Sequence, residues 1–235
     1  MSTEELFRDD AYLRECDATV IAVDGRRVVL DRTVFYPEGG GQPGDRGELR
    51  RADGAAFAVT TTRKDDDLGL VRVLAEDSAA PAAGDALTAT IDWDTRYRHM
   101  RMHTCLHLLC SLIPHPVTGG AIGADRGRLD FDMTEGIDKA AVEAALNALV
   151  AGDHPVGCRW ISDEEMRENM ALVRTMSVQP PMGSGRVRLV DVDGVDLQPC
   201  GGTHVAHTGE IGRVALGKVE NKGKHNRRVN VLLDA

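Results

Sequence analysis

The stretch "TRYRHMRMHTCLHLLCSLI", residues 95–113, is where the periodicity of the chain changes. His103, His107 and Cys110 recur in it at steps of four and three residues, so a helix would present them on one face. Pro114 follows and predicts the end of that helix. Because only short strand-like segments precede this helix, we predict a domain boundary close to residue 95.

Residues 1–94 have the pattern of a small all-β domain. "TVIAV" and "VVL" flank Asp24-Gly25, a typical hairpin turn, and "AFAVTTT", "LVRVLA" and "ALTATI" predict further strands. No helical pattern interrupts them after about residue 16. We therefore predict a β-barrel or β-sandwich for this part of the chain.

Residues 95–235 mix helices with strands. "DKAAVEAALNALVAG" predicts a helix capped by Asp138, and "SDEEMREN" begins with Ser162 and Glu165 at capping-box spacing. Strands are predicted at "GRLDFDM", "PVGCRWI", "RVRLVDV", "RVALGKV" and "RVNVLL". Because many of these segments are joined by hairpin-like turns, we expect an α+β fold with a mainly antiparallel sheet.

Composition limits the class of protein. The 235 residues are 42% hydrophobic, which is enough for one large core or two modest ones. There is no run of 18 apolar residues, and the N-terminus is acidic without an apolar region, so we expect neither a membrane span nor a secretory signal. A cytoplasmic location follows. Five cysteines are an odd number in such a chain, which favours free thiols or metal ligands over disulfides.

The net charge of −9 is unevenly distributed. Residues 1–95 carry 11 basic against 20 acidic residues, whereas residues 96–235 carry 17 of each. Residues 211–235 hold six basic residues against two acidic ones, and electrostatic attraction is local within a Debye length of about 8–10 Å. This basic strip is a candidate phosphate-binding surface, and the alternative is a solvated hairpin tip. The candidate residues are Lys222, Lys224, Arg227 and Arg228.

Two pairs of potential metal ligands occur in the second part of the chain. His103 and His107 are four residues apart on the predicted helix, with Cβ atoms about 5–6 Å apart. "PCGGTH" places Cys200 and His204 four residues apart across two glycines. Each pair alone is weak evidence for a metal site, but together the two pairs supply three imidazoles and a thiolate. This set suits zinc better than magnesium or calcium, which prefer oxygen ligands.

Other ligands and other metal enzymes fit less well. Cys110 shares the helical face but lies among leucines, as a buried thiol would. We expect His207, just after the second pair, to be exposed. A zincin protease is disfavoured because Thr104 stands where the H-E-x-x-H motif needs its glutamate.

Three longer motifs carry a family resemblance. "FYPEGGGQPGDRGEL", "HTCLHLL" and "QPCGGTHVAHTGEIG" occur in the order seen in the editing module of alanyl-tRNA synthetase and in its freestanding form, the AlaX family of trans-editing deacylases. "IDWDTRYRHMRMHTCLHLL" and "ENKGKHNRRV" also resemble that family, so the resemblance covers most of the chain. It implies a zinc site, one ion per chain, at His103, His107, Cys200 and His204.

The resemblance also implies two domains. The first, residues 1–94, would be a small barrel similar to the second domain of elongation factor Tu. The second, residues 95–235, would be an editing domain shared in outline with threonyl-tRNA synthetase. An ATP-dependent ligase is not expected, because an adenylate-forming domain and a tRNA-binding helical domain do not fit beside an editing module in 235 residues.

The glycine-rich loop "PEGGGQPG" allows two interpretations. Gly39, Gly40 and Gly41 permit positive φ angles, so their amides can face an anion or a carbonyl oxygen; the alternative is a turn between strands. No P-loop or dinucleotide signature is present, so no nucleotide cofactor is expected. In the resembled family this loop packs against the editing pocket, and by resemblance Thr33 and Gln42 are candidates to contact the aminoacyl group.

The implied reaction is hydrolysis of the aminoacyl ester of mischarged tRNA(Ala), with Ser-tRNA(Ala) and Gly-tRNA(Ala) as the expected substrates. Zinc can lower the pKa of a bound water towards about 7 and polarise a carbonyl. Four protein ligands would close a tetrahedral site, so the sequence leaves open whether the ion activates water or holds the substrate. The alternative is a zinc-stabilised RNA-binding module without catalysis, and action on esters unrelated to tRNA is disfavoured by the basic tail.

Overall fold

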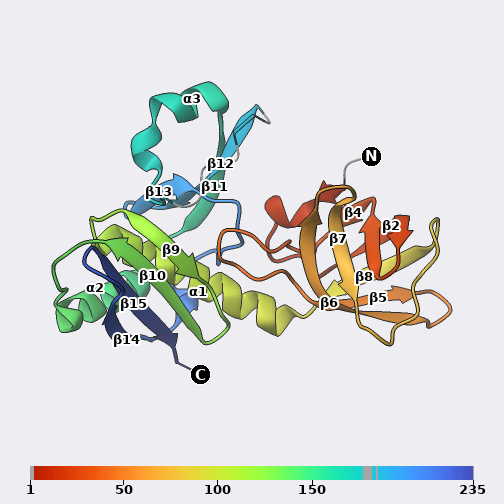
Figure 1. Cartoon of the computed structure of the whole chain (residues 1–235), viewed down its shortest axis with the longest axis horizontal. Coiled ribbons are helices and arrows are strands. Elements are labelled where there is room, and N and C mark those ends of the chain that lie inside the picture. Colours follow the sequence, from red (N-terminus) through yellow and green to blue (C-terminus); the bar gives the residue numbers. More distant parts are fainter. Residues whose placement is uncertain (1–2, 177–181, 184, 235) are drawn as a thin grey trace. The chain divides into compact units, whose positions relative to one another are not determined.

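The computed structural model describes residues 3–176, 182–183 and 185–234, and the chain divides into two compact units, residues 1–97 and 98–235. Figure 1 shows the elements of both units along the chain. The long helix α1 (Trp93–Leu112) begins in the first unit and continues in the second. Its start is two residues earlier than the sequence predicts, and it ends before Pro114 as predicted.

The first unit is a closed six-stranded barrel in which neighbouring strands are antiparallel, in the order β2-β3-β7-β6-β5-β8. A short parallel pair, β1 with β4, and a single 3₁₀ turn, η1, accompany the barrel. The bounds are β1 Glu4–Glu5, η1 Leu6–Arg8, β2 Glu15–Asp24, β3 Arg27–Leu30, β4 Arg32–Thr33, β5 Gly47–Arg51, β6 Ala56–Asp65, β7 Gly69–Leu74 and β8 Ala86–Ile91.

Alternation of side chains creates the barrel core. Along β3, Val28 and Leu30 point inward and join Leu49 of β5 and Leu74 of β7 in one buried cluster. Gly25 has a φ of 55° in the hairpin that joins β2 to β3, a conformation that favours glycine. The predicted hairpin and the strands of β6, β7 and β8 are therefore confirmed.

The glycine-rich segment forms a tight turn anchored in the first unit. Gly39 and Gln42 exchange both backbone hydrogen bonds, at 3.1 and 3.0 Å, around Gly40 and Gly41, which have φ angles of 58° and 82°. Asp45, just beyond the turn, accepts hydrogen bonds from the buried guanidinium of Arg96, including two of 3.0 and 2.9 Å from Nε. A buried ion pair of this kind fixes the conformation of the segment because breaking it would leave an uncompensated charge.

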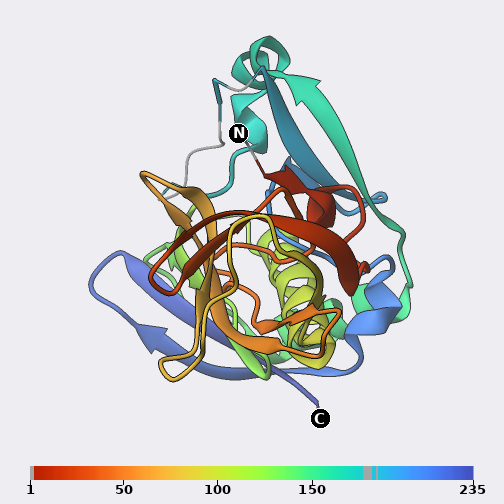
Figure 2. The same ribbon diagram turned by 90° about the vertical axis from the view of Figure 1, so that its right-hand side faces the viewer.

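The second unit contains two antiparallel sheets. The larger has the order β14-β15-β10-β9, and the smaller has the order β11-β12-β13. The bounds are β9 Val117–Ala121, β10 Arg126–Asp132, α2 Lys139–Ala151, β11 Val156–Ser162, α3 Asp163–Glu168, η2 Met170–Leu172, β12 Arg186–Val192, β13 Asp196–Pro199, η3 Thr208–Ile211, β14 Val214–Asn221 and β15 Asn226–Leu233. Figure 2 shows the β11–β12 ribbon (teal and blue) and the β14–β15 hairpin (dark blue) as separate arms of this unit.

Helices pack on the larger sheet. A Cβ atom at Gly127 of β10 would lie 2.5 Å from Sδ of Met102, so the side chain of Met102 on α1 packs directly against this glycine. Asn147 of α2 exchanges two hydrogen bonds with the backbone of Val214 in β14. Asp138 caps α2 by accepting a hydrogen bond from the amide of Ala141, as the sequence predicts.

The smaller sheet is covered on one face by α3 and η2. Met166 of α3 packs on Val187 and Leu189 of β12 in a separate buried cluster. The capping box of Ser162 and Glu165 that starts α3 is present as predicted. The α+β fold with mainly antiparallel sheets is confirmed, and the short strands β1, β4, β5, β9 and β13 are additional to those predicted.

Candidate metal centre

Four side chains in the second unit converge on one point. His103 and His107 lie one turn apart on α1, and Cys200 and His204 lie on the loop after β13. One ligand-type atom from each of the four lies within 4.8 Å of the other three. Sγ of Cys200 is 3.4 Å from Nε2 of both His103 and His204. The helix and the loop thus bring together the two predicted pairs.

Cys200 is in the chemical state that binds metal. Burial would raise the pKa of its thiol, but the imidazoles of His103 and His204 outweigh burial and hold that pKa well below its usual value. The amide of Gly202 also donates to Sγ at 3.4 Å. The lowered pKa favours the thiolate of Cys200, which is the form that ligates metal ions.

The tautomer of His204 follows from its partner, Thr104. Oγ1 of Thr104 lies 3.0 Å from the carbonyl oxygen of Met100 and 3.1 Å from Nδ1 of His204. A hydroxyl has one proton, and a carbonyl can only accept, so Thr104 donates to Met100 and accepts from Nδ1–H of His204. Nε2 of His204 then carries the lone pair and faces Cys200. Burial, and after it the neighbouring His103, lower the pKa of His204 well below its usual value, which favours the neutral ring that can ligate a metal ion.

His107 is oriented by a carboxylate. Its Nδ1 lies 3.3 Å from Oδ2 of buried Asp196, and the same oxygen accepts a hydrogen bond of 2.6 Å from Nε2 of Gln198. Burial lowers the pKa of His107, but Asp196 and Cys200 outweigh it and raise that pKa to about 9. A carboxylate behind an imidazole fixes the ring and increases its basicity towards a metal on the other nitrogen.

Arg188 of β12 holds the ligand loop in place. Its guanidinium donates hydrogen bonds of 2.9 Å to the carbonyl oxygens of both Cys200 and Gly202. The same group donates to Sγ of Cys158 on β11 at 2.8 Å. The loop is thus fixed to the smaller sheet at Cys200 and Gly202.

The donor set fits a zinc ion. Three imidazoles and one thiolate are the ligand types of zinc sites, whereas calcium and magnesium take oxygen ligands. Two of the three imidazoles have a partner on Nδ1 that leaves Nε2 for the ion. This group of residues can hold a metal ion, with His204 positioned by a hydrogen bond from its Nδ1 to Thr104 and His107 by the nearby carboxylate of Asp196.

Cys110 and His207 lie close to the cluster residues in the sequence, but neither belongs to the cluster. Cys110 is buried on α1, and burial raises the pKa of its thiol to about 11, so it stays protonated. His207 is exposed, and its Nδ1 lies 3.4 Å from the carbonyl oxygen of Asp153. Both positions agree with the roles that the sequence favours for these residues.

Thr33 and Gln42 belong to the first unit and are completely buried. Oγ1 of Thr33 accepts a hydrogen bond of 3.0 Å from the amide of Phe35, which leaves the proton of the hydroxyl for another acceptor. The backbone of Gln42 closes the glycine turn. A contact of either residue with an aminoacyl group stays a prediction.

The four predicted phosphate-binding residues lie on the β14–β15 hairpin and have different surroundings. Lys222 pairs with Glu220 at 2.8 Å, and Arg227 donates to backbone carbonyl groups. Arg228 makes two hydrogen bonds with Asp130, of 2.7 and 2.8 Å. Lys224 is exposed in the turn between the strands. Their role in binding RNA stays a prediction.

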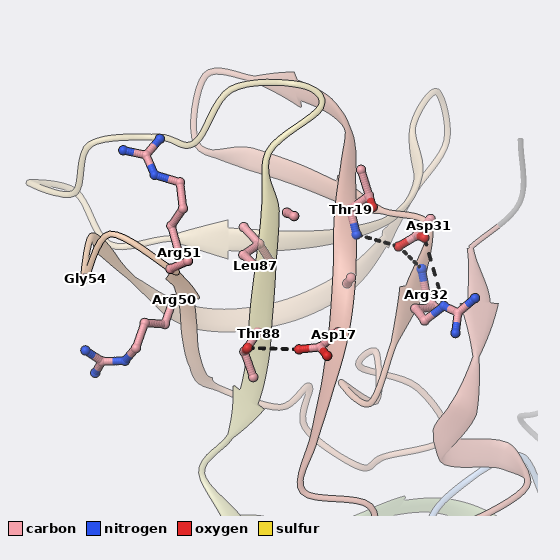
Figure 3. A pocket seen from close by; sticks show the side chains of 12 residues that line it. Asp17, Thr19, Asp31, Arg32, Arg50, Arg51, Gly54, Leu87 and Thr88 are labelled. Atoms are coloured by element: carbon pink, nitrogen blue, oxygen red, sulfur yellow. Dashed lines mark hydrogen bonds and ion pairs between the residues drawn. The ribbon is translucent and has the colours of Figure 1, made fainter.

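A hollow of about 660 Å³ lies on the barrel of the first unit, and none of the four cluster residues lines it (Figure 3). Arg50, Arg51 and Arg32 stand around it, and each has a carboxylate partner. Because the two charges of each ion pair neutralise each other, none of the described residues that line the hollow is an unpaired cation that would select an anionic ligand.

The sequence alone did not predict that Asp196 would orient His107. From the sequence, Thr104 only excluded the H-E-x-x-H motif of proteases and was not predicted as a partner of His204. Asp196 precedes Cys200 by four residues, but it lies beside His107 only because β13 pairs with β12. The role of Thr104 is visible only in three dimensions, because its partner His204 lies 100 residues away.

Comparisons with known proteins agree with this geometry. Residues 187–230 match the family described as threonyl and alanyl tRNA synthetase second additional domain, and residues 6–95 match tRNA synthetases class II (A). The chain is 41% identical to alanyl-tRNA editing protein AlaX-M of Methanosarcina acetivorans, over 97% of each chain. The AlaX-M protein of Saccharolobus solfataricus is 33% identical, again over 97% of each.

The same chain resembles part of a larger enzyme. It is 36% identical to alanine--tRNA ligase of Pyrobaculum aerophilum over 93% of its own length but only 25% of the ligase. Among the residues that the structure describes, no helix is long and apolar enough to cross a membrane.

Proposed function

The chain belongs to the family of alanyl-tRNA editing proteins, and on this premise we propose that it is a metal-dependent deacylase that hydrolyses the aminoacyl ester of mischarged tRNA(Ala). The observation that carries the proposal is the convergence of His103, His107, Cys200 and His204 within 4.8 Å. The match to alanyl-tRNA editing proteins over 97% of each chain supports this activity. A cytoplasmic location, where tRNA is charged, is part of the same proposal.

The residues of the cluster would hold one zinc ion. A bound zinc ion supplies a Lewis acid and lowers the pKa of water, both of which favour ester hydrolysis. The chain contributes the orientation of the ligands: Thr104 directs Nε2 of His204 inward, Asp196 does the same for His107, and Arg188 fixes the loop of Cys200. Such fixed positioning allows a site to act without reorganising during the reaction.

The pocket must distinguish serine and glycine from alanine. Serine adds a hydroxyl to alanine, and glycine lacks the methyl group, so only serine offers a new hydrogen-bonding group. We assign recognition of that hydroxyl to Thr33, whose proton remains to be donated. An unpaired buried hydroxyl costs about 1–3 kcal/mol, which corresponds to a preference of about 5- to 150-fold. Gln42 is the second candidate for contact with the aminoacyl group.

Initial rates of deacylation on seryl-, glycyl- and alanyl-tRNA(Ala) test the proposal. We expect seryl to be cleaved fastest, glycyl more slowly and alanyl slowest, and we expect Thr33→Val to lose most of the preference for serine. Thr60→Val is the matched control, because Thr60 is exposed and donates to a backbone carbonyl of the barrel. Cleavage of the alanyl ester as fast as the seryl ester by the wild type contradicts editing. A full serine preference in Thr33→Val removes only Thr33 from its role.

The second candidate is a zinc-stabilised RNA-binding module without catalysis. The basic β14–β15 hairpin would bind RNA in either case, so it supports this module as well as a deacylase. Tight binding of tRNA by the zinc-loaded protein with no cleavage of any of the three esters would select this alternative.

A further inference from the structure

The smaller sheet presents one row of side chains that leads from the metal centre to its outer edge. Trp160 of β11 pairs with Arg188 of β12, and the amide of Cys200 donates to the carbonyl oxygen of Arg188 at 3.1 Å. Residues directly opposite each other on neighbouring strands have side chains on the same face. Arg186 follows two residues before Arg188 and shares that face. Figure 1 shows β11 and β12 extending from β13 towards α3.

The opposite face of the same sheet has a different character. Val187 and Leu189 point to that face and are covered by Met166 of α3. Arg159 lies on it too, close enough to Glu165 to lower the pKa of that carboxyl, although hydrogen bonds to Ser162 lower it more. The acidic helix α3 is therefore on the far side of the sheet from Trp160 and Arg186.

Trp160 is an exposed aromatic residue beside a cation. The residue is 37% exposed on the edge strand of the sheet, and the guanidinium carbon of Arg186 lies 4.3 Å from the centre of its ring. An indole with an arginine over its face is the type of surface on which unpaired nucleobases stack.

The distance between this surface and the metal centre suits a short piece of single-stranded RNA. Trp160 and Cys200 are two strand spacings apart, about 10 Å between backbones. Arg188 lies between the two: it is the register partner of Trp160, and its guanidinium binds Cys158 of β11 and the carbonyl oxygen of Cys200. An ester at the cluster would thus have its own nucleotide, or the one before it, within reach of the indole.

We propose that Trp160 and Arg186 form a stacking site for an unpaired base at the 3′ end of the RNA whose ester lies at the metal centre. The inference rests on the proposed function for the identity of the RNA. The indole supplies a flat apolar face, and the arginine supplies positive charge near the phosphate groups. Stacking of this kind is tolerant of sequence, which suits an end that is the same in every tRNA.

Binding of RNA without an amino acid gives the first test. The probes are a single-stranded RNA hexamer ending in CCA and a blunt RNA hairpin of equal charge, titrated while tryptophan fluorescence is recorded. We expect the hexamer to quench Trp160, and Trp160→Ala to weaken its binding about 5- to 150-fold, the range measured for one stacked base. Trp160→Phe should retain part of the affinity. The signal of Trp93, the other tryptophan, is obtained from the Trp160→Phe protein.

Two control variants isolate the stacking surface. Arg159→Gln removes the same charge as Arg186→Gln from the same ribbon but on the opposite face. Leu232→Ala removes an apolar side chain of similar exposure, 40%, from the larger sheet. We expect Arg186→Gln to weaken binding of the hexamer and both controls to leave it within twofold.

Steady-state kinetics on mischarged tRNA give the second test. If the base stacks on Trp160, Trp160→Ala should raise KM about 5- to 150-fold and leave kcat within about threefold. An unchanged KM together with unquenched fluorescence and unchanged hexamer binding overturns the inference. If the wild type cleaves no mischarged tRNA, the proposed deacylase function fails, whereas the hexamer titration still decides whether the stacking site exists.

Discussion

Removing the hydroxyl of Thr104 tests how the metal centre is built. Thr104→Val keeps the volume of the side chain but leaves Nδ1–H of His204 without its acceptor at 3.1 Å. The amide of Val205 loses the same acceptor, at 3.3 Å. His204 can then adopt the tautomer that carries its proton on Nε2. In that tautomer Nε2, the nitrogen that faces Cys200, has no lone pair left for a metal ion. Losing the partner of a ligating imidazole typically lowers metal affinity about 10- to 100-fold, or about 1.4–2.7 kcal/mol.

Chelator competition at fixed pH measures this change directly. We expect Thr104→Val to have a zinc Kd about 10- to 100-fold above that of the wild type, and Thr104→Ser to restore most of the affinity. Ser111→Ala is the matched control, because Ser111 also donates to a backbone carbonyl of α1, at 2.8 Å, but contacts no ligand. Circular dichroism of the metal-free proteins confirms that each variant is folded. A Kd within twofold of wild type in folded Thr104→Val would refute the tautomer assignment.

Three further predictions concern metal content, RNA binding and pH. Elemental analysis should find about one zinc per chain in the wild type, much less in Cys200→Ala and His103→Ala, and an unchanged amount in His207→Ala; full zinc in Cys200→Ala would remove Cys200 from the ligands. Affinity for tRNA should fall with salt, with a log–log slope of about −0.7 to −0.9 per phosphate contact, and alanine at Lys222, Lys224, Arg227 and Arg228 should flatten it. Arg228, already bound to Asp130, should contribute least, so Lys224→Ala should change the slope more than Arg228→Ala. Burial raises the pKa of Asp130, but the hydrogen bonds from Arg228 and Arg128 outweigh burial and lower that pKa overall. The ionised Asp130 therefore stabilises the folded state at pH values above the usual carboxyl pKa of about 4. This stabilisation is lost as the pH falls through the lower pKa that Asp130 has in the folded state. The difference in unfolding free energy between wild type and Asp130→Asn should therefore shrink from pH 7 to pH 3, and a constant difference would contradict it.

The sequence predicted the elements that have strong local signals. α1, α2 and α3 were predicted from helical spacing and from the caps at Asp138 and Ser162. The change of period near residue 95 predicted an α+β fold whose first part is a β-barrel or β-sandwich, and the family resemblance specified the barrel. Paired spacings of four residues gave the cluster of ligands. These features depend on neighbouring residues, which a sequence shows directly.

Long-range features were not predictable in the same way. β13 has only four residues, ends in Pro199 and exists because it pairs with β12. β9 contains two glycines, which lower its intrinsic strand propensity, and pairs with β10. The pairing of β13 places Asp196 behind His107, so the residue that orients this ligand could be found only in the folded chain.

The order in which a ribosome makes this chain has a consequence for the metal centre. His103 and Cys200 are 97 residues apart, and protein synthesis adds about 5–20 residues per second. The histidine pair of α1 is thus made roughly 5–20 s before its partners and meanwhile offers a metal ion only two ligands. Four-fold ligation begins only when β13 has paired with β12 and delivered Cys200 and His204. A metal ion held by all four residues would therefore be captured late, by a nearly complete second unit.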